Sequence, residues 1–168
     1  MELTVVAAVF CSDDKVLCLR RAAGRSMAGL WEFPGGKVER GESLPEALVR
    51  EINEELQVDI TVGSYLGENR YTPDQTGNPP ANTSAIASTS VSATVSPDVS
   101  ANDSSADATL PPVNIMLHAF QVDHWSGQFN LSDHDQMLWS TAGQMRSLHW
   151  SPADVPFVDL LCERLAKR

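Results

Sequence analysis

The sequence has few cysteines, few basic residues and no long hydrophobic run, and each shortage argues against a class of protein. The 3 cysteines include no CxxC pair, so we expect reduced thiols in a cytoplasmic protein rather than a disulfide framework. The formal net charge of -10, from 12 basic and 22 acidic residues, argues against a nucleic-acid polymer as partner. The longest apolar run, residues 5–11, is too short to cross a bilayer, and we expect neither a secretory signal nor a membrane partner.

The length of 168 residues suits one folded unit, and we expect a single domain over residues 1–168. Apolar and β-branched residues between turn residues predict strands. These cover residues 3–11, 15–19, 30–33, 60–71 and 113–125, with a short strand near Trp139. A Ser-Asp-Asp turn joins the first two into a predicted hairpin, and Pro34-Gly35-Gly36 ends the third as a strand breaker.

Two helices are predicted, and the first has clear start signals. Ser43 begins it, with Glu46 as its capping-box partner and Pro45 tolerated in the first turn. An apolar residue at every fourth position gives this helix one buried stripe. The stripe consists of Leu44, Leu48, Ile52 and Leu56. The second helix covers about residues 156–166 at the end of the chain.

Residues 72–112 differ in composition from the rest of the chain. They contain no lysine, arginine or aromatic residue and consist mainly of Ser, Thr, Ala, Pro, Asn and Asp. Such a segment cannot bury enough apolar surface to offset the conformational entropy lost on ordering. We therefore predict a disordered insertion between two strands of the domain.

The first helix carries Glu51, Glu54 and Glu55, whose spacing places three carboxylates on one face. A glutamate-rich helix is usually a solvated charge run. Here the preceding Gly-Gly turn, the adjacent Arg50 and the buried stripe alongside favour a metal site instead. Hard divalent cations take carboxylate and carbonyl oxygens, so we predict Mg²⁺, with Mn²⁺ as the alternative.

The residues around this cluster match a known pattern. They are Gly36, Glu42, Arg50, Glu51, Ile52, Glu54, Glu55 and Val58. The chain therefore resembles the Nudix family, whose signature is G-x5-E-x7-R-E-U-x-E-E-x-G-U, with U an aliphatic residue. Only the second glycine differs, where Gln57 stands at the expected helix end. A left-handed C-cap there costs a non-glycine residue about 1 kcal/mol.

The resemblance implies a fold and a metal site. The implied fold is α+β, a Nudix-type α-β-α sandwich with a mixed β-sheet between helices. By position, Glu51, Glu54 and Glu55 would bind the metal together with the backbone carbonyl of Gly35. Arg50 would hold these carboxylates in place, and Glu42 would support them from the outer shell.

Further segments resemble the MutT branch of that family, which hydrolyses oxidised or unwanted nucleoside triphosphates to monophosphate and pyrophosphate. They are residues 20–23, 27–28, 32–37 and 150–156. The resemblance implies an 8-oxo-dGTP diphosphatase-like role in nucleotide-pool sanitation and DNA repair.

Several substrate contacts follow from the same resemblance. Arg21 would contact phosphate, although it could instead be a surface charge at a strand end. Glu32, Phe33, Pro34 and Gly35 would line the nucleotide pocket. Asp154 would read the base edge, or alternatively cap the last helix. An ionised Asp only accepts hydrogen bonds, where the Asn of some relatives also donates, and the preferred base stays open.

Asp133 and His134 precede Trp139 as a Glu-His pair does in many relatives. Asp133 would reach the metal or act as general base, and the sequence does not choose between it and Glu51. We interpret His134 as a plain loop histidine.

Rival interpretations remain at this stage. One is a Nudix hydrolase that acts on another substrate, such as ADP-ribose, a dinucleotide or a CTP/dCTP-type nucleotide. A nucleotide sensor without catalysis is the other. The sequence leaves the oligomeric state open between monomer and homodimer.

Overall fold

The computed structural model describes residues 1–73 and 113–167, so nearly all of the predicted insertion at 72–112 lies outside the described residues. In chain order the elements are β1 (Glu2–Val9), β2 (Cys11–Ser12), β3 (Lys15–Arg21), β4 (Trp31–Glu32), β5 (Gly35–Lys37), α1 (Leu44–Leu56), β6 (Asp59–Tyr71), β7 (Asn114–Ser126), β8 (His134–Ser140), α2 (Ala142–Ser147) and α3 (Val155–Ala166). No helix of this described part is long and apolar enough to span a membrane.

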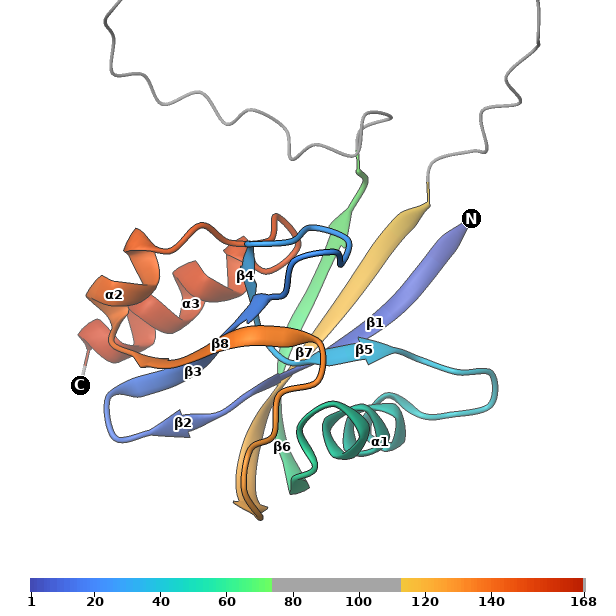
Figure 1. The fold of residues 1–168 in the computed structure, drawn as a ribbon, viewed down its shortest axis with the longest axis horizontal. Coiled ribbons are helices and arrows are strands. Elements are labelled where there is room, and N and C mark those ends of the chain that lie inside the picture. Colours follow the sequence, from blue (N-terminus) through green and yellow to red (C-terminus); the bar gives the residue numbers. More distant parts are fainter. Residues whose placement is uncertain (74–112, 168) are drawn as a thin grey trace, which may run out of the picture.

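The strands form two sheets with helices on both sides (Figure 1). The first sheet has the order β5-β1-β7-β6, and it is mixed because β1 runs parallel to β7 and antiparallel to β5. The second contains β2, β3 and β4, with β8 paired to β3. In Figure 1, α1 lies on one side of the strands and α2 and α3 on the other. This confirms the α+β sandwich with a mixed sheet.

Alternate side chains of β1 pack into two different layers of the hydrophobic core. Val6 and Ala8 join the cluster that includes Leu48 and Ile52 of α1. Ala7 and Val9 join the opposite cluster, which includes residues of α3. Successive side chains of a strand point to opposite faces, so β1 is covered on both sides and reads as an unbroken apolar run.

The predicted hairpin of residues 3–11 with 15–19 is wrong for most of its length. Only Cys11 and Ser12 pair with β3, whereas β1 pairs with β5 and β7 in the other sheet. The chain changes sheet at Phe10, whose buried ring contacts Trp125 and Phe129. These partners are more than 100 positions away, so local sequence could not show that the strand divides here.

The Pro34-Gly35-Gly36 breaker follows the end of β4, but its two glycines also begin a further strand, β5. Gly35 runs so close to β1 that an added Cβ would overlap the carbonyl oxygen of Val6, and only glycine allows that approach. The strand thereby places residues 35–37 directly beside α1, which supplies the carboxylates.

Helix α1 forms as its sequence signals predict. Ser43 and Glu46 make both hydrogen bonds of the capping box. Leu48, Ile52 and Leu56 are fully buried. Gln57 ends the helix in the left-handed conformation, at φ 57° and ψ 36°, so the glycine position of the signature keeps its backbone geometry without glycine.

Candidate functional site

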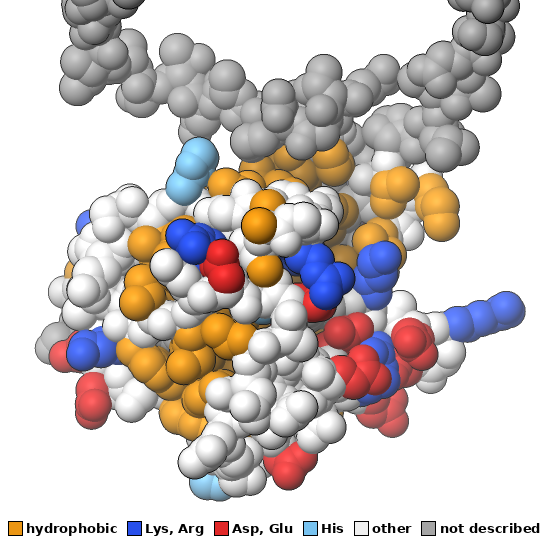
Figure 2. Space-filling view, in the orientation of Figure 1, with side chains coloured by type: hydrophobic (Ala, Val, Ile, Leu, Met, Phe, Trp, Pro, Cys, Tyr) orange, Lys and Arg blue, Asp and Glu red, His pale blue; other side chains and the backbone are white. Residues whose placement is uncertain are grey.

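One cleft, of about 840 Å³, collects nearly all the predicted site residues. Its acidic end is formed by Glu51, Glu54 and Glu55 of α1. Its pocket end is formed by Phe33, Asp154 and apolar side chains of β1 and β7. Pro34 is the predicted residue that does not line the cleft, because it is fully buried. In Figure 2 acidic side chains gather over α1, next to basic ones.

Arg50 organises the acidic end. Its guanidinium donates to Glu42 at 2.6 and 2.9 Å, to Glu51 at 3.0 Å and to Glu54 at 3.2 Å. It also donates to the carbonyl oxygen of Lys37, which ties α1 to β5. The bond from Arg50 holds the pKa of Glu42 down to about 2. Arg50 therefore holds Glu42, Glu51 and Glu54 close together through its hydrogen bonds.

The three glutamates of α1 differ in exposure. The side chain of Glu54 is 62% exposed, that of Glu51 19% and that of Glu55 11%. Burial raises the pKa of Glu55 to about 7, although His134 and the N–H of Gly35 act in the opposite direction. The Gly35 N–H donates to Glu55 at 3.0 Å.

These residues fit a divalent cation. Gly36 leaves room for the Glu51 carboxylate, since a Cβ at that position would overlap it. Among the described residues, ligand atoms of Glu32, Glu55 and His134 lie within 4.8 Å of one another. Carboxylate oxygens arranged in this way are ligands that a hard cation takes from proteins.

The interpretation of His134 as a plain loop histidine is wrong. It is the first residue of β8, its side chain is fully buried, and Nε2 lies 2.8 Å from Oε1 of Glu32. A register shift in the pairing of β3 with β8 sets it opposite Arg21. The spacing of His134 from Trp139 was the one sequence signal that could have placed it at the site. The sequence predicted only a short strand near Trp139 and not that β8 begins at His134.

At the pocket end, Arg21 and Glu32 form a partly buried ion pair. Arg21 donates to Glu32 at 2.9 Å and to the carbonyl oxygen of Ser26 at 2.6 Å. Both residues line the cleft, so Arg21 is more than a surface charge. Phe33 is buried and packs on Trp150 with ring centroids 4.9 Å apart.

Asp154 is only 4% exposed and faces the cleft. It occupies the N-cap position of α3, as the alternative interpretation expected, but its side chain makes no capping bond. Its Oδ1 instead accepts a hydrogen bond from the N–H of Phe33 at 3.2 Å. Burial raises the pKa of Asp154 to about 8, and Glu32 adds to the rise. The raised pKa favours the neutral carboxyl, which can donate as well as accept, unlike the ionised Asp assumed from sequence.

Asp133 lies at the rim of the cleft, with 45% of its side chain exposed, and pairs with Arg25 at 2.5 Å. Like Glu51 and Glu54, it is not part of the group of close ligand atoms found among residues 1–73 and 113–167. The contact with Arg25 was not predicted, because the loop that carries this arginine shows no sequence signal for it.

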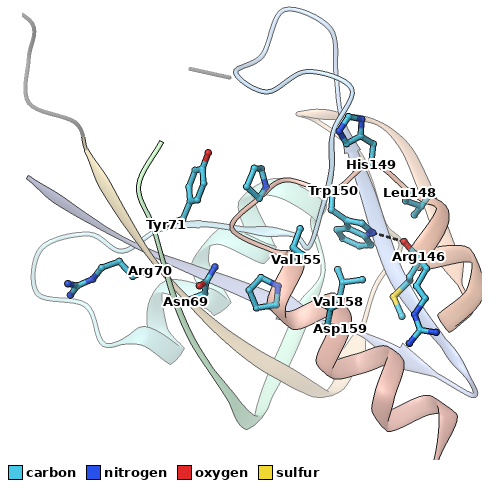
Figure 3. Close-up of a pocket in the computed structure, with 13 residues that line it drawn as sticks. Asn69, Arg70, Tyr71, Arg146, Leu148, His149, Trp150, Val155, Val158 and Asp159 are labelled. Atoms are coloured by element: carbon cyan, nitrogen blue, oxygen red, sulfur yellow. Dashed lines mark hydrogen bonds between the residues drawn. The ribbon is translucent and has the colours of Figure 1, made fainter. Parts of the chain in front are cut away.

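A second pocket, of about 850 Å³, contains none of the predicted site residues (Figure 3). Tyr71, Trp150 and Val158 stand around it, and the Trp150 indole donates to the carbonyl oxygen of Met145 at 2.7 Å. Asp159 is its only acidic residue among the described lining side chains. The glutamates predicted to bind the metal therefore line the first cleft and not this pocket.

Known proteins share both the sequence and the fold. The model of the NUDIX domain matches residues 1–154. A CTP pyrophosphohydrolase of Escherichia coli (strain K12) is 30% identical over 166 residues, covering 99% of this chain and 96% of that protein. A putative 8-oxo-dGTP diphosphatase 2 of Mycobacterium tuberculosis is 28% identical over 153 residues, covering 89% and 81%.

Solved structures agree with these relatives. The solution structure of the E. coli ORF135 protein has a TM-score of 0.67 at 29% identity and covers 99% of this chain and 93% of that one. A MutT protein from Methanosarcina mazei Go1, at 20% identity and a TM-score of 0.64, covers 99% and 94% and shares the fold. The chain thus belongs to the Nudix family of hydrolases, which act on the phosphoanhydride bonds of nucleotides and generally use a divalent metal.

Proposed function

We propose that this protein hydrolyses nucleoside triphosphates to the monophosphate and pyrophosphate, with Mg²⁺ as cofactor. The observation that carries the proposal is one cleft that joins an organised carboxylate cluster to the buried carboxyl of Asp154. The acidic end suits a cation-bound phosphate chain, and the pocket end suits a flat polar base. The two relatives compared above are named for the same type of substrate, a nucleoside triphosphate.

At the acidic end, Glu51, Glu54 and Glu55 would hold the cation together with the carbonyl of Gly35. Bound Mg²⁺ would neutralise the phosphates and lower the pKa of the attacking water. Arg50 holds two of the glutamates in place through its hydrogen bonds. We assign phosphate contact to Arg21, which lines the same cleft.

Glu51 and Asp133 are the two candidates for the general base. Glu51 is paired with Arg50 at 3.0 Å on the helix, and Asp133 with Arg25 at 2.5 Å on the rim. Comparing kcat of Glu51→Gln and Asp133→Asn across pH separates them. The base is the residue whose loss removes the rise of kcat with pH, since that rise reports its deprotonation.

At the pocket end, the neutral Asp154 can present a donor and an acceptor together. Cytosine offers an acceptor ring nitrogen beside an amino group, and oxidised guanine offers an N–H beside a carbonyl oxygen. Both fit this edge. The E. coli relative is named for CTP and the mycobacterial relative for 8-oxo-dGTP. We therefore propose a role in nucleotide-pool sanitation and keep both bases as candidates.

A substrate panel tests the proposal. Normal and oxidised nucleoside triphosphates, ADP-ribose and a dinucleotide are each incubated with Mg²⁺, and pyrophosphate and orthophosphate are measured separately. Pyrophosphate release from a triphosphate supports the proposal. Preference for ADP-ribose or the dinucleotide indicates the other Nudix substrates, and binding without turnover indicates a sensor.

A further inference from the structure

His134 is a buried polar residue beside the cleft, and the proposed mechanism gives it no role. Its side chain is fully buried between two carboxylates. Nε2 lies 2.8 Å from Oε1 of Glu32. Nδ1 lies 3.3 Å from Oε1 of Glu55, yet it forms no aligned hydrogen bond with any described residue. A buried polar atom without a hydrogen bond is costly and calls for an explanation.

The ring of His134 links the two ends of the cleft. On one side Glu32 of β4 accepts from Arg21, the residue assigned to the phosphates. On the other side Glu55 of α1 accepts from Gly35 through its second oxygen, Oε2. The only other polar contact described for the Glu55 carboxylate is His134. The imidazole therefore stands where it can fix the direction of that carboxylate.

We propose that His134 is a positioning residue, which orients Glu55 for the metal and is itself oriented by Glu32. This inference rests on the proposed function in taking Glu55 as a metal ligand. The contact of Nε2 with Glu32 at 2.8 Å fixes the ring, and the fixed ring packs against the Glu55 carboxylate, whose Oε1 lies 3.3 Å from Nδ1. Residues that orient a metal ligand without binding the metal themselves typically increase metal affinity, and their loss lowers it by about 10–100-fold.

The proposal distinguishes Glu32 from a direct ligand. Glu32 contacts Nε2 and Glu55 lies near Nδ1, so the proposal assigns the effect of Glu32 on the metal to the ring, although ligand atoms of all three residues lie within 4.8 Å of one another. Removing the ring should therefore remove the effect of changing Glu32. A direct ligand would keep its effect whether or not the ring is present.

The test measures Mn²⁺ affinity in the absence of nucleotide, by the electron paramagnetic resonance signal of free Mn²⁺. The full chain is compared as wild type, His134→Gln, Glu32→Gln and the double variant. We expect each single variant to bind Mn²⁺ about 10-fold more weakly, and the double variant to match His134→Gln. His118→Gln is the matched control, because His118 contacts Tyr65 and lies outside the cleft. It should bind Mn²⁺ as the wild type does.

Three results would overturn the proposal. One is unchanged Mn²⁺ affinity in His134→Gln, and another is a full additional loss in the double variant. The third is a nitrogen coupling from directly bound imidazole in the Mn²⁺ spectrum. Thermal melts in a chelator check the fold, and if His134→Gln does not fold, Glu32→Gln and the nitrogen coupling still decide. Failure of the triphosphate substrate panel would leave these metal measurements valid, so the two proposals can fail separately.

Discussion

Gly36 provides a sharp test of how the acidic end is built. A Cβ at this position would overlap the Glu51 carboxylate, and even the farther oxygen, Oε1, would lie only 2.7 Å away. Ordinary contact begins at about 3.4 Å, so in Gly36→Ala the carboxylate must move by about 1 Å. The side chain of Glu51 can do so, because its end is flexible and the backbone is not involved.

The expected consequence is a loss of function with little loss of stability. A displacement of about 1 Å at a reacting centre lowers turnover by about 100-fold. The Arg50–Glu51 pair is also disturbed, which changes the free energy of unfolding by about 1 kcal/mol or less for a partly exposed pair. Gly36→Ala should therefore fold normally, bind Mn²⁺ more weakly and turn over slowly.

Two other glycines serve as controls for Gly36→Ala. In Gly35→Ala the new methyl overlaps the backbone of Val6, which cannot move freely, so this variant should lose about 1–3 kcal/mol of stability. A Cβ at Gly143 meets nothing within 4 Å, so Gly143→Ala should keep both stability and activity. Near-normal kcat and Mn²⁺ affinity in Gly36→Ala would refute the packing of Glu51 against this glycine as a requirement of the site.

Three further predictions concern the carboxylates and the cap of α1. Glu54→Gln and Glu55→Gln should each lower kcat by about 100-fold or more while thermal melts stay close to wild type, and normal activity in both would remove the metal assignment. Asp154 ionises near its ordinary pKa of 3.8 when unfolded but near 8 when folded, so its contribution to stability is complete below pH 3.8 and is lost as pH rises toward 8. Melts from pH 5 to 8 should therefore show a steeper decline for wild type than for Asp154→Asn, and equal slopes would contradict the buried neutral carboxyl. Gln57→Gly should raise the free energy of unfolding by about 0.5–1 kcal/mol, measured by urea denaturation, because glycine adopts the left-handed cap without strain; a loss of stability would contradict this.

Helix α1 and the carboxylate cluster could be predicted because their signals are local. Ser43 and Glu46 lie within one turn, and the apolar stripe repeats every fourth residue. The position of Arg50 beside Glu54 follows from the i,i+4 spacing of the helix. For such features the chain itself sets the geometry, and tertiary contacts only preserve it.

The other half of the site depends on contacts between distant segments. His134 meets Glu32 and Glu55 only because β8 pairs with β3 beside β4, which no local pattern specifies. Asp154 becomes neutral because the fold buries it, and a sequence shows an aspartate without its surroundings. The division of the first predicted strand at Phe10 could not be predicted either, because the residues that Phe10 contacts also come from a distant segment.

The most direct measurement of the central claim is the product analysis of nucleoside triphosphate hydrolysis by phosphorus-31 NMR. With Mg²⁺, we predict nucleoside monophosphate and pyrophosphate in equal amounts, and no turnover in a chelator or in Glu55→Gln. Release of orthophosphate and nucleoside diphosphate, or turnover that persists without divalent metal, would contradict the account.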